Sequence, residues 1–135
     1  MAAEYIALAP QTVAVGANVI WENTACHSNS CAIIHRDESG IITLNGKGKY
    51  RITFGANVSS ATAATTSVLA ISIDGEAIPY TAMASISDAA NDIGNIGRVI
   101  LLDVPCYCCA KVGIRNIGAQ AAIIEDANII IEKVG

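Results

Sequence analysis

The side chains best suited to bind a metal are cysteines and histidines, and they gather in two short segments. They are Cys26, His27, Cys31 and His35 in the first segment and Cys106, Cys108 and Cys109 in the second. Thiolate and imidazole are the usual zinc ligands, and structural sites commonly place a Cys-x(2–4)-Cys pair on a tight turn. Here the spacings are Cys-x4-Cys and Cys-x-Cys-Cys, and the second group falls in a strand-like run. These spacings give a zinc site only weak support.

The same five cysteines also have a simpler interpretation. Their number is odd, and the opening residues MAAEYIALAP lack the basic start of a secretory signal. In a reducing compartment a thiol is a small apolar side chain. We therefore predict free thiols and assign no metal ligand, and a Cys26–Cys31 disulfide or a metal site remain the alternatives.

Oxygen ligands for calcium occur in one polar stretch, residues 85–97. They are Asp88, Asn91, Asp92 and Asn95. Their spacing follows no recognised calcium-loop signature and lacks a terminal bidentate glutamate. Asp and Asn in a glycine-containing loop more often serve turn geometry, so we predict a turn here. A calcium site would instead favour a ligand-recognising adhesin.

Catalytic residues are sparse in this chain. Both histidines precede residue 36, no G-x-S-x-G elbow is present, and Asp37 and Glu38 fall in a predicted turn. Little of what an active site requires can be found. We therefore predict a protein that is not an enzyme, with no catalytic residue and no cofactor.

The composition limits the class of protein further. With 135 residues the chain is long enough for one domain with a real core. Hydrophobic residues make up 53% and charged residues 15%, yet no run approaches the roughly 18 apolar residues of a membrane helix. Apolar surface that one small β-domain cannot hide usually marks a contact surface. The composition therefore predicts a homo-oligomer that is not embedded in a membrane.

The net charge of −4 argues against nucleic acid as a partner. The densest positive stretch is Lys47, Lys49 and Arg51, on the polar face of a predicted strand. A duplex-binding protein normally brings several cations to one face. We therefore expect no nucleic-acid partner.

The elements that must position all these residues are β-strands. Residues 48–58, GKYRITFGANV, alternate apolar and polar side chains, which is the two-residue period of a strand with one buried face. Asn45-Gly46 and Asp74-Gly75 are strong turn dipeptides. Strands are expected at 12–15, 18–22, 32–36, 41–44, 48–58, 68–73, 76–80, 98–104, 110–117 and 127–134.

The connections are expected at 23–30, 85–97 and 118–126, and residues 1–10 are expected to form an N-terminal arm before a single domain, 11–135. Trp21 is expected in the core or at a subunit contact. The other predicted core residues are Tyr50, Ile52, Phe54, Leu69, Ile71, Ile73, Val99, Leu101, Ile114 and either Ile129 or Ile130. Roughly eight to ten short strands predict a two-sheet sandwich or a barrel.

Two segments carry a resemblance to a known family. They are residues 48–79, GKYRITFGANVSSATAATTSVLAISIDGEAIP, and the terminal ANIIIEKVG. Both resemble the C-terminal domain of the collagen-like exosporium glycoprotein of Bacillus-type spores, with its "GxYxIT" strand, its "xIxVNGxxxP" hairpin and its closing "IIIEKV" strand. The resemblance implies a jelly-roll β-sandwich of the tumour-necrosis-factor and complement type, assembled as a homotrimer.

The family protein carries a Gly-X-Y collagen stalk before this domain, and about ten residues stand there in this chain. Modules without a stalk also resemble bacteriophage virion components, such as capsid decoration proteins, head fibres and fibre tips. The resemblance therefore implies a structural protein on the virion surface, made in the host cytoplasm, with a capsid or other virion protein as partner. The alternatives are a spore-surface protein and an adhesin tip that binds a host-surface glycan.

Overall fold

The protein folds into two antiparallel sheets. The computed structural model describes residues 2–26, 32–36, 38–105 and 109–135. The first sheet contains, in order, β10 (Gly94–Val104), β6 (Gly48–Ser59), β12 (Ala122–Lys133), β1 (Ala2–Ala7) and β3 (Asn23–Cys26), and β2 (Gln11–Val13) pairs with the start of β12. The second contains β4 (Ile33–His35), β5 (Ile42–Leu44), β11 (Ala110–Asn116), β7 (Thr65–Ile73) and β8 (Glu76–Ala77), and β9 (Met83–Ser87) also pairs with β7.

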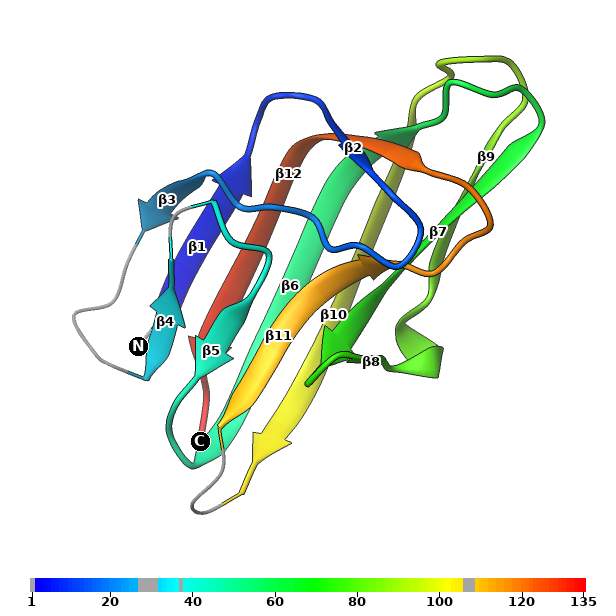
Figure 1. The fold of residues 1–135 in the computed structure, drawn as a ribbon. Helices are drawn as coiled ribbons and strands as arrows, with labels where there is room; N and C mark the ends of the chain where they lie inside the picture. The colour runs from blue at the N-terminus through cyan, green and yellow to red at the C-terminus, as the bar shows by residue number, and fades with distance from the viewer. Residues whose placement is uncertain (1, 27–31, 37, 106–108) are drawn as a thin grey trace.

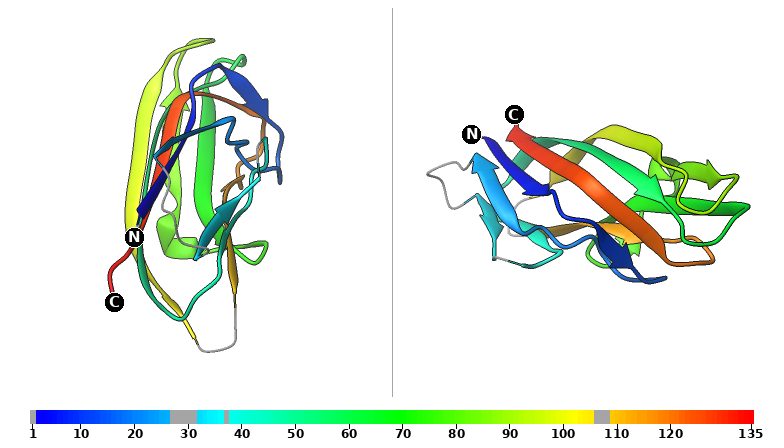
Figure 2. Two further views of the ribbon diagram at one scale, coloured as in Figure 1. Left: turned by 90° about the vertical axis from the view of Figure 1, so that its left-hand side faces the viewer. Right: turned by 90° about the horizontal axis from the view of Figure 1, so that it is seen from above.

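The two sheets pack face to face as the layers of a sandwich, as Figures 1 and 2 show. Strand neighbours within a sheet are mostly far apart in the sequence, since β12 lies between β1 and β6 in the first sheet. One short 3-10 helix, η1 (Pro79–Thr81), follows β8. Within the described part of the chain, no helix is long and apolar enough to cross a membrane.

The core lies between the layers and consists of alternate residues from both sheets. In β6 the side chains of Tyr50, Ile52 and Phe54 are buried, whereas Lys49 and Arg51 are exposed. The period of two therefore gives β6 one core face and one outer face. Trp21 is fully buried and meets Phe54 edge-on, with ring centroids 6.1 Å apart, which confirms its predicted core position.

The predicted core is confirmed for most of its members. Fully or almost fully buried are Tyr50, Ile52, Phe54, Leu69, Ile71, Ile114 and Ile129. Ile73 is half-buried against the core. Of the two candidates in the last strand, Ile129 faces the core, and Ile130 faces outward and is half-buried.

Val99 and Leu101 were predicted in the core, and that prediction is wrong. Their exposed fractions are 57% and 65%, whereas Ile100 between them is 5% exposed. The run Val99 to Leu102 is apolar at every position, so hydrophobicity alone could not show which face of β10 points inward.

The element boundaries differ from the prediction at several places. The expected arm 1–10 contains β1, which pairs with β12 from Ala2 opposite Glu132 to Ala7 opposite Ala127. The buried positions of β1 include Ala3 and Ala7. Their small side chains make the alternation of buried and outward residues hard to recognise in the sequence. The expected loop 85–97 instead holds the end of β9 and the start of β10.

The expected connection 118–126 overlaps β12, which starts at Ala122 and has an irregular register between Glu125 and Asn128. The expected loop 23–30 begins with β3. Conversely, residues 18–22 form no strand and pair only through two isolated bridges, Asn18 with Arg115 and Trp21 with Ser39. The turn at Asp74-Gly75 is confirmed, since both residues have positive φ, 53° and 89°, and connect β7 to β8.

The contrast between inner and outer positions predicts unequal costs for the same substitution. Ile114→Ala removes a fully buried side chain and should lower the free energy of unfolding by about 2–5 kcal/mol. Ile86→Ala, at a position 68% exposed on β9, should change it by less than about 0.5 kcal/mol. Urea denaturation followed by Trp21 fluorescence measures both values. Equal costs would contradict the placement of the core.

Two buried tyrosines of the first sheet differ in their hydrogen bonding. The Tyr50 hydroxyl donates to the Gly46 carbonyl oxygen at 2.8 Å, whereas among the described residues the Tyr5 hydroxyl has no partner. Burial raises the pKa of both phenols from the ordinary value of 10.0. The preference of the folded state for the neutral phenols therefore contributes fully to the free energy of unfolding below about pH 10. This contribution is lost as the pH rises through the raised pKa values.

This difference predicts opposite results for two matched variants. Tyr50→Phe loses a hydrogen bond and should reduce the free energy of unfolding by about 1 kcal/mol. Tyr5→Phe removes a buried hydroxyl that has no hydrogen-bond partner among the described residues, so stability at neutral pH should stay equal or rise by up to about 1 kcal/mol. Thermal and urea unfolding give the two values. A larger loss for Tyr5→Phe than for Tyr50→Phe would contradict the interpretation.

Candidate functional site

The residues that suggested a metal site are only partly placed by the structure. His27, Cys31, Cys106 and Cys108 lie outside the described residues, as do the side chain of Cys26 and the Cys26–Cys31 disulfide alternative. His35 lies in β4, with its Nε2 atom 2.8 Å from the Ser39 carbonyl oxygen, and Cys109 is an exposed free thiol. The described ranges bring no three His, Cys, Asp or Glu side chains together as a metal would need.

The residues considered for calcium serve the turn between β9 and β10. The Asp92 carboxylate accepts from the Ala89 amide at 3.1 Å, and Asn91 has a φ of 65°. The Asn95 side chain lies on β10 and donates to the Asn57 side-chain oxygen at 3.1 Å. Asp88 is joined through its carbonyl oxygen to the Ala64 amide, which ties this turn to the loop after β6. These contacts assign Asp88, Asn91 and Asp92 to the turn, whereas Asn95 belongs to a cross-strand pair between β10 and β6.

Of the two carboxylates considered for catalysis, the structure places Glu38. Asp37 lies outside the described residues, and Glu38 is exposed in a turn with a φ of 61°. His35 is half-buried and packs against Tyr5, with ring centroids 4.6 Å apart and the ring planes tilted by 49°. No acid, base and nucleophile meet among these placed residues.

The surface that combines exposed apolar side chains with regular geometry is the outer face of the first sheet. Strand register aligns its side chains in rows that cross β10, β6, β12 and β1. One row is Val99, Thr53, Ile130 and Glu4, and the next is Leu101, Arg51, Glu132 and Ala2. A third row, on the other side of the first, is Gly97, Gly55, Asn128 and Ile6. We call these three rows the outer-face rows.

The apolar side chains of the outer-face rows are concentrated on the edge strand. Val99 and Leu101 on β10 are more than half exposed, whereas Ile130 on β12 and Ile6 on β1 are partly covered by their neighbours. Gly97 and Gly55 stand opposite each other and add no side chain. The face thus has an exposed apolar ridge at β10 and flatter surface toward β1.

The charged groups of the outer-face rows have partners within these three rows. Arg51 binds Glu132 through two hydrogen bonds, the shorter of them 3.1 Å from Nη2 to Oε2. The Asn128 amide donates to the Glu4 carboxylate at 3.0 Å. Pairing within one chain lowers the cost of covering these groups, because the Arg51 and Glu132 charges offset each other and the Glu4 carboxylate accepts a hydrogen bond. The face is therefore better suited to burial than its polar residues alone suggest.

Known structures share this architecture. The globular domain of zebrafish complement 1qA protein is 11% identical, with a TM-score of 0.74 over 99% of this chain and 97% of that one. Eiger TNF from S. frugiperda is 13% identical, with a TM-score of 0.76 over 100% and 92%. Murine APRIL is 10% identical, with a TM-score of 0.72 over 98% of both chains. No protein-family model matches the sequence, and no curated protein does.

These likenesses define the class of fold. The two-sheet sandwich is a jelly roll of the complement C1q and tumour-necrosis-factor type, as the sequence resemblance implied. Identities of 8–13% carry the fold and nothing finer. The outer-face rows were not foreseen as a site, because Val99 and Leu101 were predicted to lie inside.

Proposed function

We propose that the protein is a non-enzymatic structural module whose copies associate through the outer-face rows. The observation that carries this proposal is that Val99 and Leu101 are both exposed on the same face of β10. Adjacent exposed apolar side chains on a regular sheet usually mark a contact surface. Covering them removes apolar area from water, and the paired charges beside them already have partners.

We propose that the assembly is a homotrimer. The apolar ridge lies at the β10 edge, and the flatter part of the same face lies over β12 and β1. A contact between two unlike parts of one surface is head-to-tail, and such contacts form a closed ring when the rotation between neighbouring subunits closes. A ring of three is the form that the sequence resemblance implies, and the C1q and tumour-necrosis-factor fold supports the same choice.

We further propose that the trimer is a structural part of the outer surface of a bacteriophage virion, made in the host cytoplasm and bound to a capsid protein. The resemblance of residues 48–79 and of the terminal ANIIIEKVG supports a particle-surface module. A spore surface is the alternative setting. Antibodies to the protein should label intact virions from cultures that produce it. Labelling of spores without virions would overturn the virion assignment.

The assembly itself is tested by mass in solution. The wild-type chain at micromolar concentration should scatter as a species of about 42 kDa, three times the 13.9 kDa of one chain. Leu101→Asp should reduce this species at least 100-fold in favour of monomer or aggregate, because the new carboxylate would be buried without a partner. Size-exclusion chromatography with light scattering makes the measurement.

The matched control is Val15→Asp. Val15 is 54% exposed, close to the exposure of Leu101, but lies outside the first sheet, in the segment after β2. This variant should keep the wild-type mass. A stable wild-type monomer, or a Leu101→Asp variant that keeps the wild-type mass, would refute association through the outer-face rows.

A further inference from the structure

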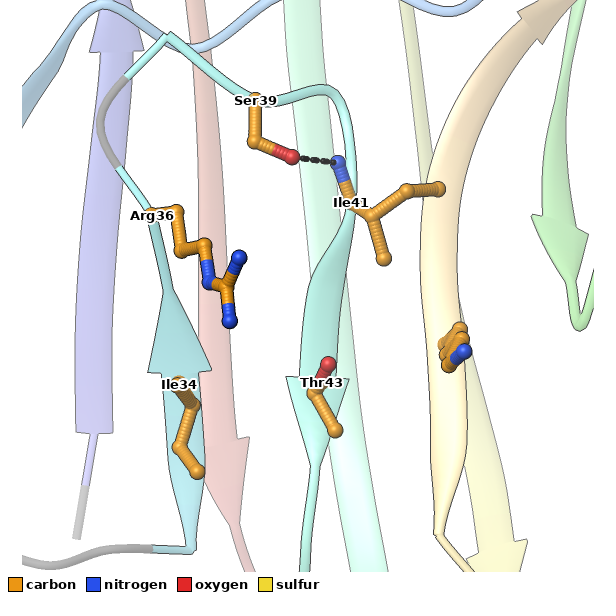
Figure 3. A pocket seen from close by; sticks show the side chains of 6 residues that line it. Ile34, Arg36, Ser39, Ile41 and Thr43 are labelled. Atoms are coloured by element: carbon orange, nitrogen blue, oxygen red, sulfur yellow. Dashed lines mark hydrogen bonds between the residues drawn. The ribbon is translucent and has the colours of Figure 1, made fainter.

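The second sheet has a pocket of about 510 Å³ on its outer face, over β4, β5 and β11 (Figure 3). It is lined by Ile34, Arg36, Ser39, Ile41, Thr43 and Lys111. Three of these residues form one row across the sheet, because Thr43 pairs with Ile34 on one side and with Lys111 on the other. Residues about 70 positions apart in the chain are thus fixed next to each other by backbone register.

A second row completes the pocket. Arg36 follows Ile34 by two residues and Ile41 precedes Thr43 by two, so their side chains project from the same face. In Figure 3 the Arg36 guanidinium lies between β4 and β5, beside the Ile34–Thr43 row. The next outward position on β11 is Gly113, which is buried beneath the side chains of Asn18 and Ser72. The charged groups that line the pocket are Arg36 and Lys111.

The pocket concentrates positive charge in a protein whose net charge is −4. Within the described ranges the ion pair is Arg51 with Glu132, on the other sheet, and neither Arg36 nor Lys111 forms an ion pair with a described carboxylate. The nearby Asp74 carboxylate accepts from the Lys111 backbone amide at 3.0 Å. Acidic side chains gather in a different hollow, lined by Glu22 and Glu38 with Gln11 and Ile20. The two signs of charge are thus separated on this surface.

The lining groups match one class of ligand. A guanidinium binds a carboxylate through two parallel hydrogen bonds, and the Lys111 ammonium adds a point charge. The Ser39 hydroxyl oxygen accepts from the Ile41 amide at 3.1 Å, which leaves its O–H free to donate, and Thr43 offers a second hydroxyl. The Ile34 and Ile41 side chains can cover the C–H face of a sugar ring. A volume of about 510 Å³ is in the usual range for small-molecule sites.

We propose that this pocket binds an acidic sugar, with Arg36 and Lys111 holding its carboxylate and with Thr43 and Ser39 holding ring hydroxyls. The site lies on the sheet opposite the outer-face rows, so the proposal does not depend on the assembly. A trimer would present three such pockets, which would raise the avidity for a polymer of acidic sugars.

The experiment is a titration of the isotope-labelled protein with sodium glucuronate, followed by amide and Arg Nε–H chemical shifts. Glucuronate should shift the signals of Ile34, Arg36, Thr43 and Lys111 and should saturate. Glucose, which lacks the carboxylate, should bind at least 10-fold more weakly. Inorganic phosphate should also bind at least 10-fold more weakly, because it cannot use the hydroxyls and the isoleucines. Equal binding of glucose or phosphate would overturn the assignment to acidic sugars.

Variants distinguish a specific binding site from nonspecific attraction of glucuronate to positively charged side chains. Arg36→Ala and Lys111→Ala should each weaken glucuronate binding at least 10-fold, and Arg36→Lys should weaken it several-fold because the planar fork is lost. Lys47→Ala removes an exposed cation outside the pocket and should leave the affinity unchanged. Equal losses in all four variants, or shifts scattered over the surface, would overturn the proposal. Light scattering of each variant shows whether assembly is unaffected.

Discussion

The strict alternation of side chains between two packed sheets is the constraint on which the rest of the structure depends. Because side chains alternate between the two faces of a strand, a residue of β10 or β12 that points into the core leaves its neighbours pointing away from it. Ile129 in the core thus forces Ile130 outward, and Ile100 forces Val99 and Leu101 outward. The exposed apolar ridge is the geometric consequence of a strand that is apolar on both faces.

Strand β6 could be predicted in detail from the sequence, and β10 could not. In β6 the apolar residues alternate with charged and polar ones, so the sequence shows both the two-residue period and the face that is buried. Tyr50, Ile52 and Phe54 are buried as expected. In β10 consecutive Val, Ile and Leu residues carry no such contrast. Burial there is decided by pairing with β6, where Ile100 stands opposite Ile52. Pairing between distant strands is a tertiary property, which a single strand's pattern does not contain.

The candidate surfaces lay beyond sequence reasoning for the same reason. The row Val99, Thr53, Ile130 and Glu4 and the row Ile34, Thr43 and Lys111 each join strands that the chain visits far apart. Residue types that attract attention in a sequence, here the cysteines and the aspartates of the 85–97 stretch, are conspicuous for their chemistry. The surfaces are instead defined by ordinary residues that register brings into line.

The pairing of β1 with β12 has a consequence for how this module can be joined to others. Ala2 stands opposite Glu132, and the Val134 amide donates to the Lys49 carbonyl oxygen, so both ends of the described chain emerge at one pole (Figure 2). The loops after β6 and β9, hydrogen-bonded to each other through Asn91 and Ser60, occupy the opposite pole (Figure 1). A short peptide is therefore long enough to join the two ends. If the chain is then opened in the distal loops, the circularly permuted protein has its termini at the opposite pole.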